Sequence, residues 1–124
     1  MVLIVEDEAM SRRALQQLLR LNGYATCAAG SAEEAMRLVD QQGPPTVALV
    51  DINLPGMSGV EFVKKVHRRF PNLSCVFMTA NDEANEERIR AGHREPTLRK
   101  PFDVPTLLTL IDDMPPRNTS CQLH

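Results

Sequence analysis

The sequence predicts an α/β fold, in which a parallel sheet is covered by helices on both faces. Three observations support this prediction. Short apolar runs alternate with segments of helical periodicity along the whole chain, so that strand–helix units follow one another. The run at 46–50 shows no alternation of apolar and polar residues, which is typical of a strand buried on both faces. Glycine, proline and serine separate the units, as expected for turns.

The first half of the chain predicts three strands, at 2–5, 24–28 and 46–50. A helix at about 10–22 places leucine and alanine at core spacing and ends at Gly23. Its predicted core positions are Ala14, Leu15, Leu18 and Leu21. Ser31 and Glu34 form a capping box, which predicts a second helix through about residue 41.

The second half repeats this pattern, with strands predicted at 74–79 and 97–99. Ser58 and Glu61 form another capping box before a helix that stops at Pro71. The segment 82–91 predicts a loosely held helix, because Ile89 is its only large hydrophobic residue. Asp103 is predicted to cap the last helix. The apolar side chains expected to face the core of these helices are Phe62, Val63, Val66, Phe70, Leu107, Leu108 and Ile111.

Composition narrows the classes of function. The net charge of −2 gives no field that would draw the chain to nucleic acid or to an anionic membrane. No apolar stretch is long enough to span a bilayer, and no signal peptide is recognised. The three cysteines have no metal-type spacing, which favours a reducing, cytoplasmic setting. The histidines, expected at the surface, are His67, His93 and His124.

The length of 124 residues fits one domain. Residues 1–114 are predicted to form that domain, and residues 115–124 a linker-like or frayed tail. Pro115 and Pro116 slightly favour a linker, so the chain is either a single-domain protein or one domain of a larger one.

Acidic side chains follow two of the predicted strands directly. Glu6 and Asp7 come after the run at 2–5, and Asp51 comes after the run at 46–50. Neighbouring parallel strands would bring these carboxylates together, where two like charges about 4 Å apart repel by roughly 4 kcal/mol at an effective dielectric near 20. Mg²⁺ prefers such oxygen ligands. We therefore expect Asp7, Asp51 and the backbone carbonyl of Asn53 to bind Mg²⁺ directly, with Glu6 holding a metal-bound water.

Further motifs make the pattern specific. Pro55-Gly56 follows Asp51, Thr79-Ala80 ends the fourth strand, and Lys100-Pro101-Phe102 follows the fifth. Together with the acids, these motifs resemble the receiver domain of two-component response regulators over essentially the whole chain. The resemblance implies a flavodoxin-like (βα)5 fold, a three-layer sandwich with a five-stranded parallel sheet of order 2-1-3-4-5.

The resemblance also implies roles for the site residues. Asp51 would accept a phosphoryl group from the phosphohistidine of a histidine kinase or phosphotransfer protein, in a reaction that needs Mg²⁺. Lys100 and Thr79 would contact the phosphoryl oxygens, and the Lys100–Pro101 bond would be cis. The chain would be a switch and not an enzyme with a separate substrate. Its output would go to a downstream protein or a fused effector domain through the surface from the fourth helix to the last.

This chain departs from the receiver pattern at Thr97, where receivers usually carry an aromatic residue that moves with the threonine. That coupling is therefore in doubt. Asn53 and Asn81 occupy the positions that influence attack by water in receivers. Both can orient a water molecule, so we expect a phosphoryl lifetime of seconds to minutes.

Two other functions compete with this interpretation. A phosphatase of the haloacid dehalogenase type needs a second acid two residues after the nucleophile, and this chain has Asn53 there. A degenerate receiver, which binds partners without phosphorylation, is disfavoured by the complete set of Asp7, Asp51, Thr79 and Lys100, but Thr97 in place of the usual aromatic residue leaves this alternative open. The sequence leaves open whether the chain forms a homodimer. It predicts no direct contact with nucleic acid or membrane.

Overall fold

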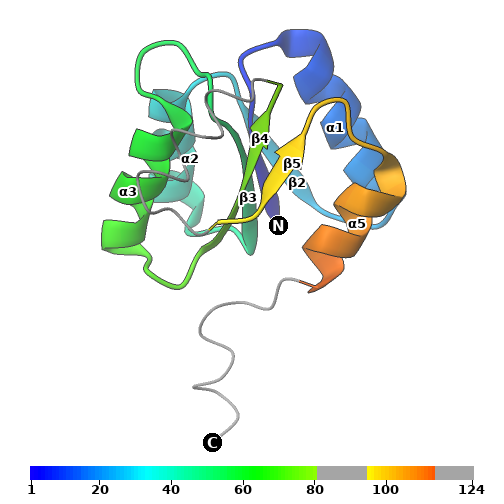
Figure 1. Cartoon of the computed structure of the whole chain (residues 1–124). Helices are drawn as coiled ribbons and strands as arrows, with labels where there is room; N and C mark the ends of the chain where they lie inside the picture. The colour runs from blue at the N-terminus through cyan, green and yellow to red at the C-terminus, as the bar shows by residue number, and fades with distance from the viewer. Residues whose placement is uncertain (81–94, 114–124) are drawn as a thin grey trace, which may run out of the picture.

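The computed structural model describes residues 1–80 and 95–113. Within these residues, five parallel strands form one sheet in the order β2-β1-β3-β4-β5 (Figure 1). This confirms the predicted α/β class and strand order. The strands are β1 (Val2–Val5), β2 (Thr26–Ala29), β3 (Val47–Asp51), β4 (Ser74–Thr79) and β5 (Thr97–Arg99).

In the described part of the chain, four helices cover the two faces of the sheet: α1 (Ala9–Leu21), α2 (Ala32–Gln42), α3 (Gly59–Arg69) and α5 (Val104–Asp113). Figure 1 shows α2 and α3 on one side of the sheet and α1 and α5 on the other. Alternate residues of β1 lie on opposite faces of the sheet, because successive side chains of a strand point in opposite directions. Leu3 and Val5 join the core under α2 and α3, whereas Val2 and Ile4 join the core under α1 and α5.

The helices begin where the capping residues predict. The hydroxyl oxygens of Ser31 and Ser58 accept hydrogen bonds from the backbone N–H groups of Glu34 and Glu61, at 3.1 and 3.2 Å. Asp103 Oδ1 accepts from the N–H of Thr106 at 2.8 Å. These bonds supply acceptors for the free N–H groups of the first helical turns. The cap of α1 was not predicted from the sequence and is described with the site.

Two details of the first half differ from the prediction. Leu15 and Leu19 are the buried residues of α1, whereas Leu21 is 77% exposed and Ala14 is also exposed. The second strand begins at Thr26 and not at residue 24. Closely spaced leucines in one helix allow more than one choice of buried face. The prediction was right for Leu15, and Leu18 packs partly buried against the core, but it was wrong for Ala14 and Leu21. The strand β3 includes Asp51 itself, so the carboxylate is held by the sheet.

The second half matches more closely. Strands β4 and β5 have the predicted bounds, and every residue of β4 is buried. Phe62, Val63 and Val66 are buried on α3, and Leu107 and Ile111 on α5. The prediction for His67 was wrong. This side chain is half-buried, and its Nε2 lies 2.9 Å from the carbonyl oxygen of Leu73.

Several predictions fall outside the described residues. They are the helix at 82–91 with Ile89, the roles of Asn81, His93 and His124, and the tail at 115–124. The domain boundary after residue 114 and much of the expected partner surface therefore stay predictions. In the part of the chain that the structure describes, no helix is long and apolar enough to cross a membrane.

Candidate functional site

The polar residues singled out in the sequence meet at the carboxyl ends of the central strands. Val5 lies opposite Val50 in the sheet, so Glu6 leaves β1 beside Asp51 at the end of β3. Thr79 ends β4 opposite Arg99 of β5. The N–H of Lys100 donates to the carbonyl oxygen of Thr79 at 2.7 Å, which fixes the start of the loop after β5. Parallel pairing thus brings residues that are far apart in the sequence together at the carboxyl end of the sheet.

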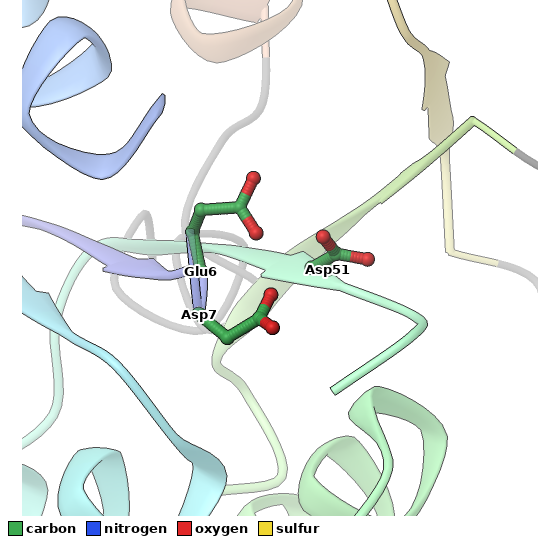
Figure 2. A group of neighbouring side chains, drawn as sticks. All are labelled: Glu6, Asp7 and Asp51. Atoms are coloured by element: carbon green, nitrogen blue, oxygen red, sulfur yellow. The ribbon is translucent and has the colours of Figure 1, made fainter. Parts of the chain in front are cut away.

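Glu6, Asp7 and Asp51 form a carboxylate cluster. Each offers an oxygen that lies within 4.8 Å of the oxygens offered by the other two. Figure 2 shows Asp51 at the end of β3, with Glu6 and Asp7 reaching toward it from the end of β1. Glu6 is 1% exposed and Asp51 is 7% exposed, whereas Asp7 is open to solvent. Two acids of the cluster are therefore removed from water, and the third faces it.

Lys100 neutralises the buried part of this cluster. Its Nζ donates to Oδ2 of Asp51 at 2.9 Å and to Oε1 of Glu6. The sequence assigned Glu6 to a metal-bound water, but the structure places Glu6 in direct contact with Lys100. The other Glu6 oxygen, Oε2, is buried and has no hydrogen-bond partner among the described residues. Because an unpaired buried polar atom is costly, we expect this oxygen to bind a further partner.

Burial and pairing push the two buried acids in opposite directions. Burial and contact with the Asp51 carboxylate together raise the pKa of Glu6 to about 7, while Lys100 acts to lower it. For Asp51, burial acts to raise the pKa, but contacts with Glu6, Lys100 and the Asn53 N–H outweigh burial and lower it. Burial acts to lower the pKa of Lys100, and its two acidic partners raise it instead. Asp51 is thus the carboxylate kept ionised, as a nucleophile must be.

The backbone around Asp51 is held closely. The N–H of Asn53 donates to Asp51 Oδ1 at 2.9 Å, which orients the carboxylate. Gly59, the first residue of α3, packs against the Asp51 main chain, and a Cβ there would lie only 2.2 Å from the carbonyl oxygen of Asp51. Gly56, with a φ of +73°, makes the turn between them. Strand, turn and helix start therefore form one tight unit around Asp51.

Thr79 and Thr97 occupy neighbouring strands but different environments. Thr79 is 2% exposed at the end of β4, next to the end of β3. Thr97 begins β5 opposite Phe77 and is half-buried. Its Oγ1 is buried without a hydrogen-bond partner among the described residues. The Lys100–Pro101 peptide bond is cis, as the resemblance implied.

The donor set fits a hard divalent cation. Three carboxylates lie together at the carboxyl end of the sheet, and one of them is exposed. This arrangement matches the preference of Mg²⁺ for oxygen ligands and for retained water molecules. The buried, unpaired Glu6 Oε2 adds an acceptor at the same place. Asp7, Asp51 and the Asn53 carbonyl remain the expected direct ligands. A hollow of about 490 Å³ opens beside Glu6 and Lys100, between α1 and the loop after β5, and its walls include Leu15, Leu18 and Phe102.

Three features of the site were not predicted. Glu8 caps α1 by accepting from the N–H groups of Met10 and Ser11 at 3.2 and 2.7 Å. Arg12, one helical turn later, donates to the backbone carbonyl of Glu6. Gly59 contacts Asp51, as described above. A glycine at a first helical position was a usable sequence signal for the close contact with Asp51, because its helix propensity is poor. The local spacing gave no signal for the contact of Arg12 with the Glu6 carbonyl.

Comparison with known proteins agrees with this arrangement. The family model for the response regulator receiver domain matches residues 2–112. The polar-differentiation response regulator DivK of Brucella ovis is 34% identical over 113 residues, covering 89% of this chain and 91% of that protein. A cyclic di-GMP phosphodiesterase of Thermotoga maritima is 36% identical over 108 residues, which cover 86% of this chain but only 28% of that protein. A CheY-like receiver domain structure from Methanospirillum hungatei has a TM-score of 0.79 at 28% identity, covering 90% of each chain.

Proposed function

Because the chain belongs to the response regulator receiver domain family of two-component signalling, we propose that it acts as a phosphorylation switch with Asp51 as the phosphoacceptor. The observation that carries this proposal is the pair of contacts from Lys100 to Asp51 and Glu6. These contacts hold the buried Asp51 carboxylate in its ionised form at the carboxyl end of the sheet, where the N–H of Asn53 orients it.

The transfer itself needs one nucleophile and one leaving group. An oxygen of the Asp51 carboxylate attacks the phosphorus of a phosphohistidine, a P–O bond forms, and the P–N bond breaks. The electron pair of that bond stays on the imidazole, which takes up a proton from solvent. The product is an acyl phosphate, which water hydrolyses readily, so the signal is transient.

Each residue of the site has a share in stabilising the transferring group. In phosphoryl transfer the protein mainly positions groups and neutralises charge on the phosphoryl oxygens. Lys100 pairs with one of these oxygens, and the Thr79 hydroxyl donates to another. Asp7, Asp51 and the Asn53 carbonyl would hold Mg²⁺, which neutralises negative charge on the phosphoryl group when it is bound. Glu6 lies beside them and completes the acidic set.

The phosphoryl group carries about −1.5 to −2 charges and new acceptor oxygens, enough to draw Thr79 and the start of its loop inward. The proposed partners are a histidine kinase or phosphotransfer protein as donor and a downstream protein or fused effector domain as target. On this view the chain is a regulator whose chemistry is limited to its own phosphorylation and dephosphorylation. The phosphorylation-independent alternative is disfavoured because Lys100 and Asp51 are already paired.

Acetyl phosphate tests the proposal without a known kinase. With Mg²⁺, intact-mass measurement should show one phosphoryl adduct on the wild-type chain and none on Asp51→Asn. Asp40→Asn is a matched control and should form the adduct like the wild-type chain, because Asp40 is a half-exposed acid that pairs with Arg69 away from the site. An adduct that forms equally well in Asp51→Asn would remove Asp51 from the reaction. An adduct that survives for many hours in Mg²⁺ buffer would contradict the expected lifetime of seconds to minutes.

A further inference from the structure

The side chain of Arg12 ends against the peptide groups of the two adjacent acids. Its Nη1 donates to the carbonyl oxygen of Glu6 at 2.9 Å and lies 3.4 Å from the carbonyl oxygen of Asp7. The N–H of Glu6 donates to Ala29 of β2, but the chain leaves the sheet at this point. The Glu6 carbonyl therefore lies past the last pair of the β1 ladder, where a partner must come from elsewhere.

Gly30 provides the space for this contact. A Cβ at Gly30 would lie 3.1 Å from Arg12 Nη1 and 3.7 Å from Arg12 Cζ, so the guanidinium lies against the bare Cα. The N–H of Gly30 donates to Glu34 Oε2 at 3.4 Å, which holds the turn before α2 in place. The guanidinium group of Arg12 thus packs between the loop after β1 and the loop after β2.

We propose that Arg12 is a positioning residue for the proposed metal site. By binding the carbonyls of Glu6 and Asp7, it fixes the two peptide planes from which these carboxylates project. Glu8 holds the other end of the same short loop by capping α1. The loop is therefore fixed at both ends, and the Asp7 side chain is presented toward Asp51. The consequence for phosphoryl transfer rests on the proposed function, but the effect on cation binding does not.

The sign of the effect separates positioning from simple electrostatics. Arg12 carries a positive charge near a site that should bind a cation. If the charge alone mattered, its removal would strengthen Mg²⁺ binding, because like charges repel. If Arg12 positions the ligands, its removal weakens Mg²⁺ binding instead. The two explanations predict opposite changes in the same dissociation constant.

The test measures Mg²⁺ binding by NMR titration of the ¹⁵N-labelled protein. Removing a residue that orients a metal ligand typically weakens binding by about tenfold or more, so Arg12→Met should raise the Mg²⁺ dissociation constant by roughly that factor. Arg13→Met is the matched control, since Arg13 is an exposed arginine at the next position of α1 and should leave the constant within about twofold. An unchanged or tighter constant in Arg12→Met would overturn the inference.

Gly30→Ala provides a second variant that keeps the arginine and its charge. The added methyl group would push the guanidinium away from Glu6, so Mg²⁺ binding should weaken, by less than in Arg12→Met. In the Arg12→Met background the same substitution should change nothing further, because the two act through one contact. Equal effects of Gly30→Ala in both backgrounds would contradict the mechanism. If Arg12→Met folds poorly, Gly30→Ala in the otherwise unchanged chain still decides the question, because an unchanged Mg²⁺ dissociation constant there would overturn the inference.

Phosphorylation by acetyl phosphate separates this inference from the proposed function. The rate for Arg12→Met should be low at limiting Mg²⁺ and recover at saturating Mg²⁺. A rate that stays low at saturation would assign Arg12 a direct part in transfer and overturn the positioning role. If the wild-type chain forms no adduct, the proposed function fails, and the Mg²⁺ titrations still decide the inference about Arg12.

Discussion

The two ends of the sheet are built by the same strands but differ in chemistry. At the carboxyl end, two buried acids and a lysine meet beside a solvent-exposed acid. At the amino end, a hollow of about 350 Å³ is lined by Pro44, Pro45, Phe70 and Pro71 among others. The charged groups near it, Arg69 and Asp40, pair at the surface with about half of each side chain exposed.

This difference shows which loops build the candidate site and which close the core. The ends of β1, β3 and β5 carry two buried acids and a lysine, which would be unfavourable if unpaired and which contact one another. Loops that precede β3 and β4 carry prolines and an aromatic ring, and the Arg69–Asp40 pair beside them stays half in water. The His67–Glu95 contact at the amino end is more buried, but it joins only two groups. The predictions that follow test this contrast, from the largest expected effect to the smallest.

Gly59→Ala should cause the largest loss of stability. Its Cβ would lie 2.2 Å from the Asp51 carbonyl oxygen, so the backbone must move. Overpacking of this kind costs about 2–3 kcal/mol, and urea denaturation should show it as a lower midpoint. Gly30→Ala at the same end is the control. Its Cβ would meet only the flexible side-chain tips of Arg12 and Glu34, and stability should change by less than about 1 kcal/mol. Equal losses of stability for Gly59→Ala and Gly30→Ala would contradict the close packing of Gly59 against Asp51.

Lys100→Met tests whether charge pairing at the carboxyl end is stronger than at the amino end. Losing the cation leaves Asp51 and Glu6 buried without it, and we expect a loss of roughly 1–2 kcal/mol in Mg²⁺-free buffer at neutral pH. This is below the value for fully buried pairs, because about a quarter of the Lys100 side chain is exposed. Arg69→Met breaks the exposed pair with Asp40 and should cost less than about 0.5 kcal/mol. Similar losses for both variants would contradict the contrast.

His67→Leu probes the amino end. The ring nitrogen of His67 lies 2.9 Å from the Leu73 carbonyl oxygen, and its Nδ1 is 3.8 Å from Glu95 Oε1. Loss of the bond to Leu73 should lower the free energy of unfolding by about 1 kcal/mol. The rate of phosphorylation by acetyl phosphate should not change, because the site lies at the other end of the strands. Lys64→Leu, at an exposed position of the same helix, controls for added apolar surface.

At neutral pH, the smallest effect should be the proton-linked contribution of Glu6 to stability, which grows as the pH falls. Its pKa is raised from 4.5 to about 7, so the folded chain binds a proton more tightly than the unfolded chain. The resulting stabilisation is present in full below pH 4.5 and is lost as the pH rises through about 7. In Mg²⁺-free buffer, Glu6→Gln should remove this component from the stability curve, whereas Glu61→Gln on the exposed face of α3 should not. Parallel curves for wild type and Glu6→Gln would argue against the raised pKa.

Much of this arrangement could be predicted from local sequence. Apolar runs without alternation indicated buried strands, and acids directly after two runs indicated the carboxyl end of the sheet as a site. The hydroxyl and carboxylate caps at Ser31, Ser58 and Asp103 were predicted because capping depends on residues only three positions apart. The receiver resemblance then supplied the strand order, which local patterns do not determine.

The remaining features depend on how elements cross in space. The choice between Leu19 and Leu21 as a core residue depends on how α1 rotates against the sheet. The contact of Arg12 with the Glu6 carbonyl requires α1 to pack back against β1, with Gly30 next to the guanidinium group. The half-buried position of His67 depends on the loop at Leu73. None of these relations follows from spacing along a single segment.

The double contact of Lys100 has a further consequence for how the signal ends. An ammonium group has three hydrogens, and in the resting chain two of them already serve Glu6 and Asp51. On the proposed function, an incoming phosphoryl oxygen must use the third hydrogen or displace one acid, so the phosphorylated arrangement would compete with contacts that are already made. Once the phosphoryl group had left, the lysine could return to both acids. We therefore expect the contacts of the resting site to favour the return of the proposed switch to its starting geometry.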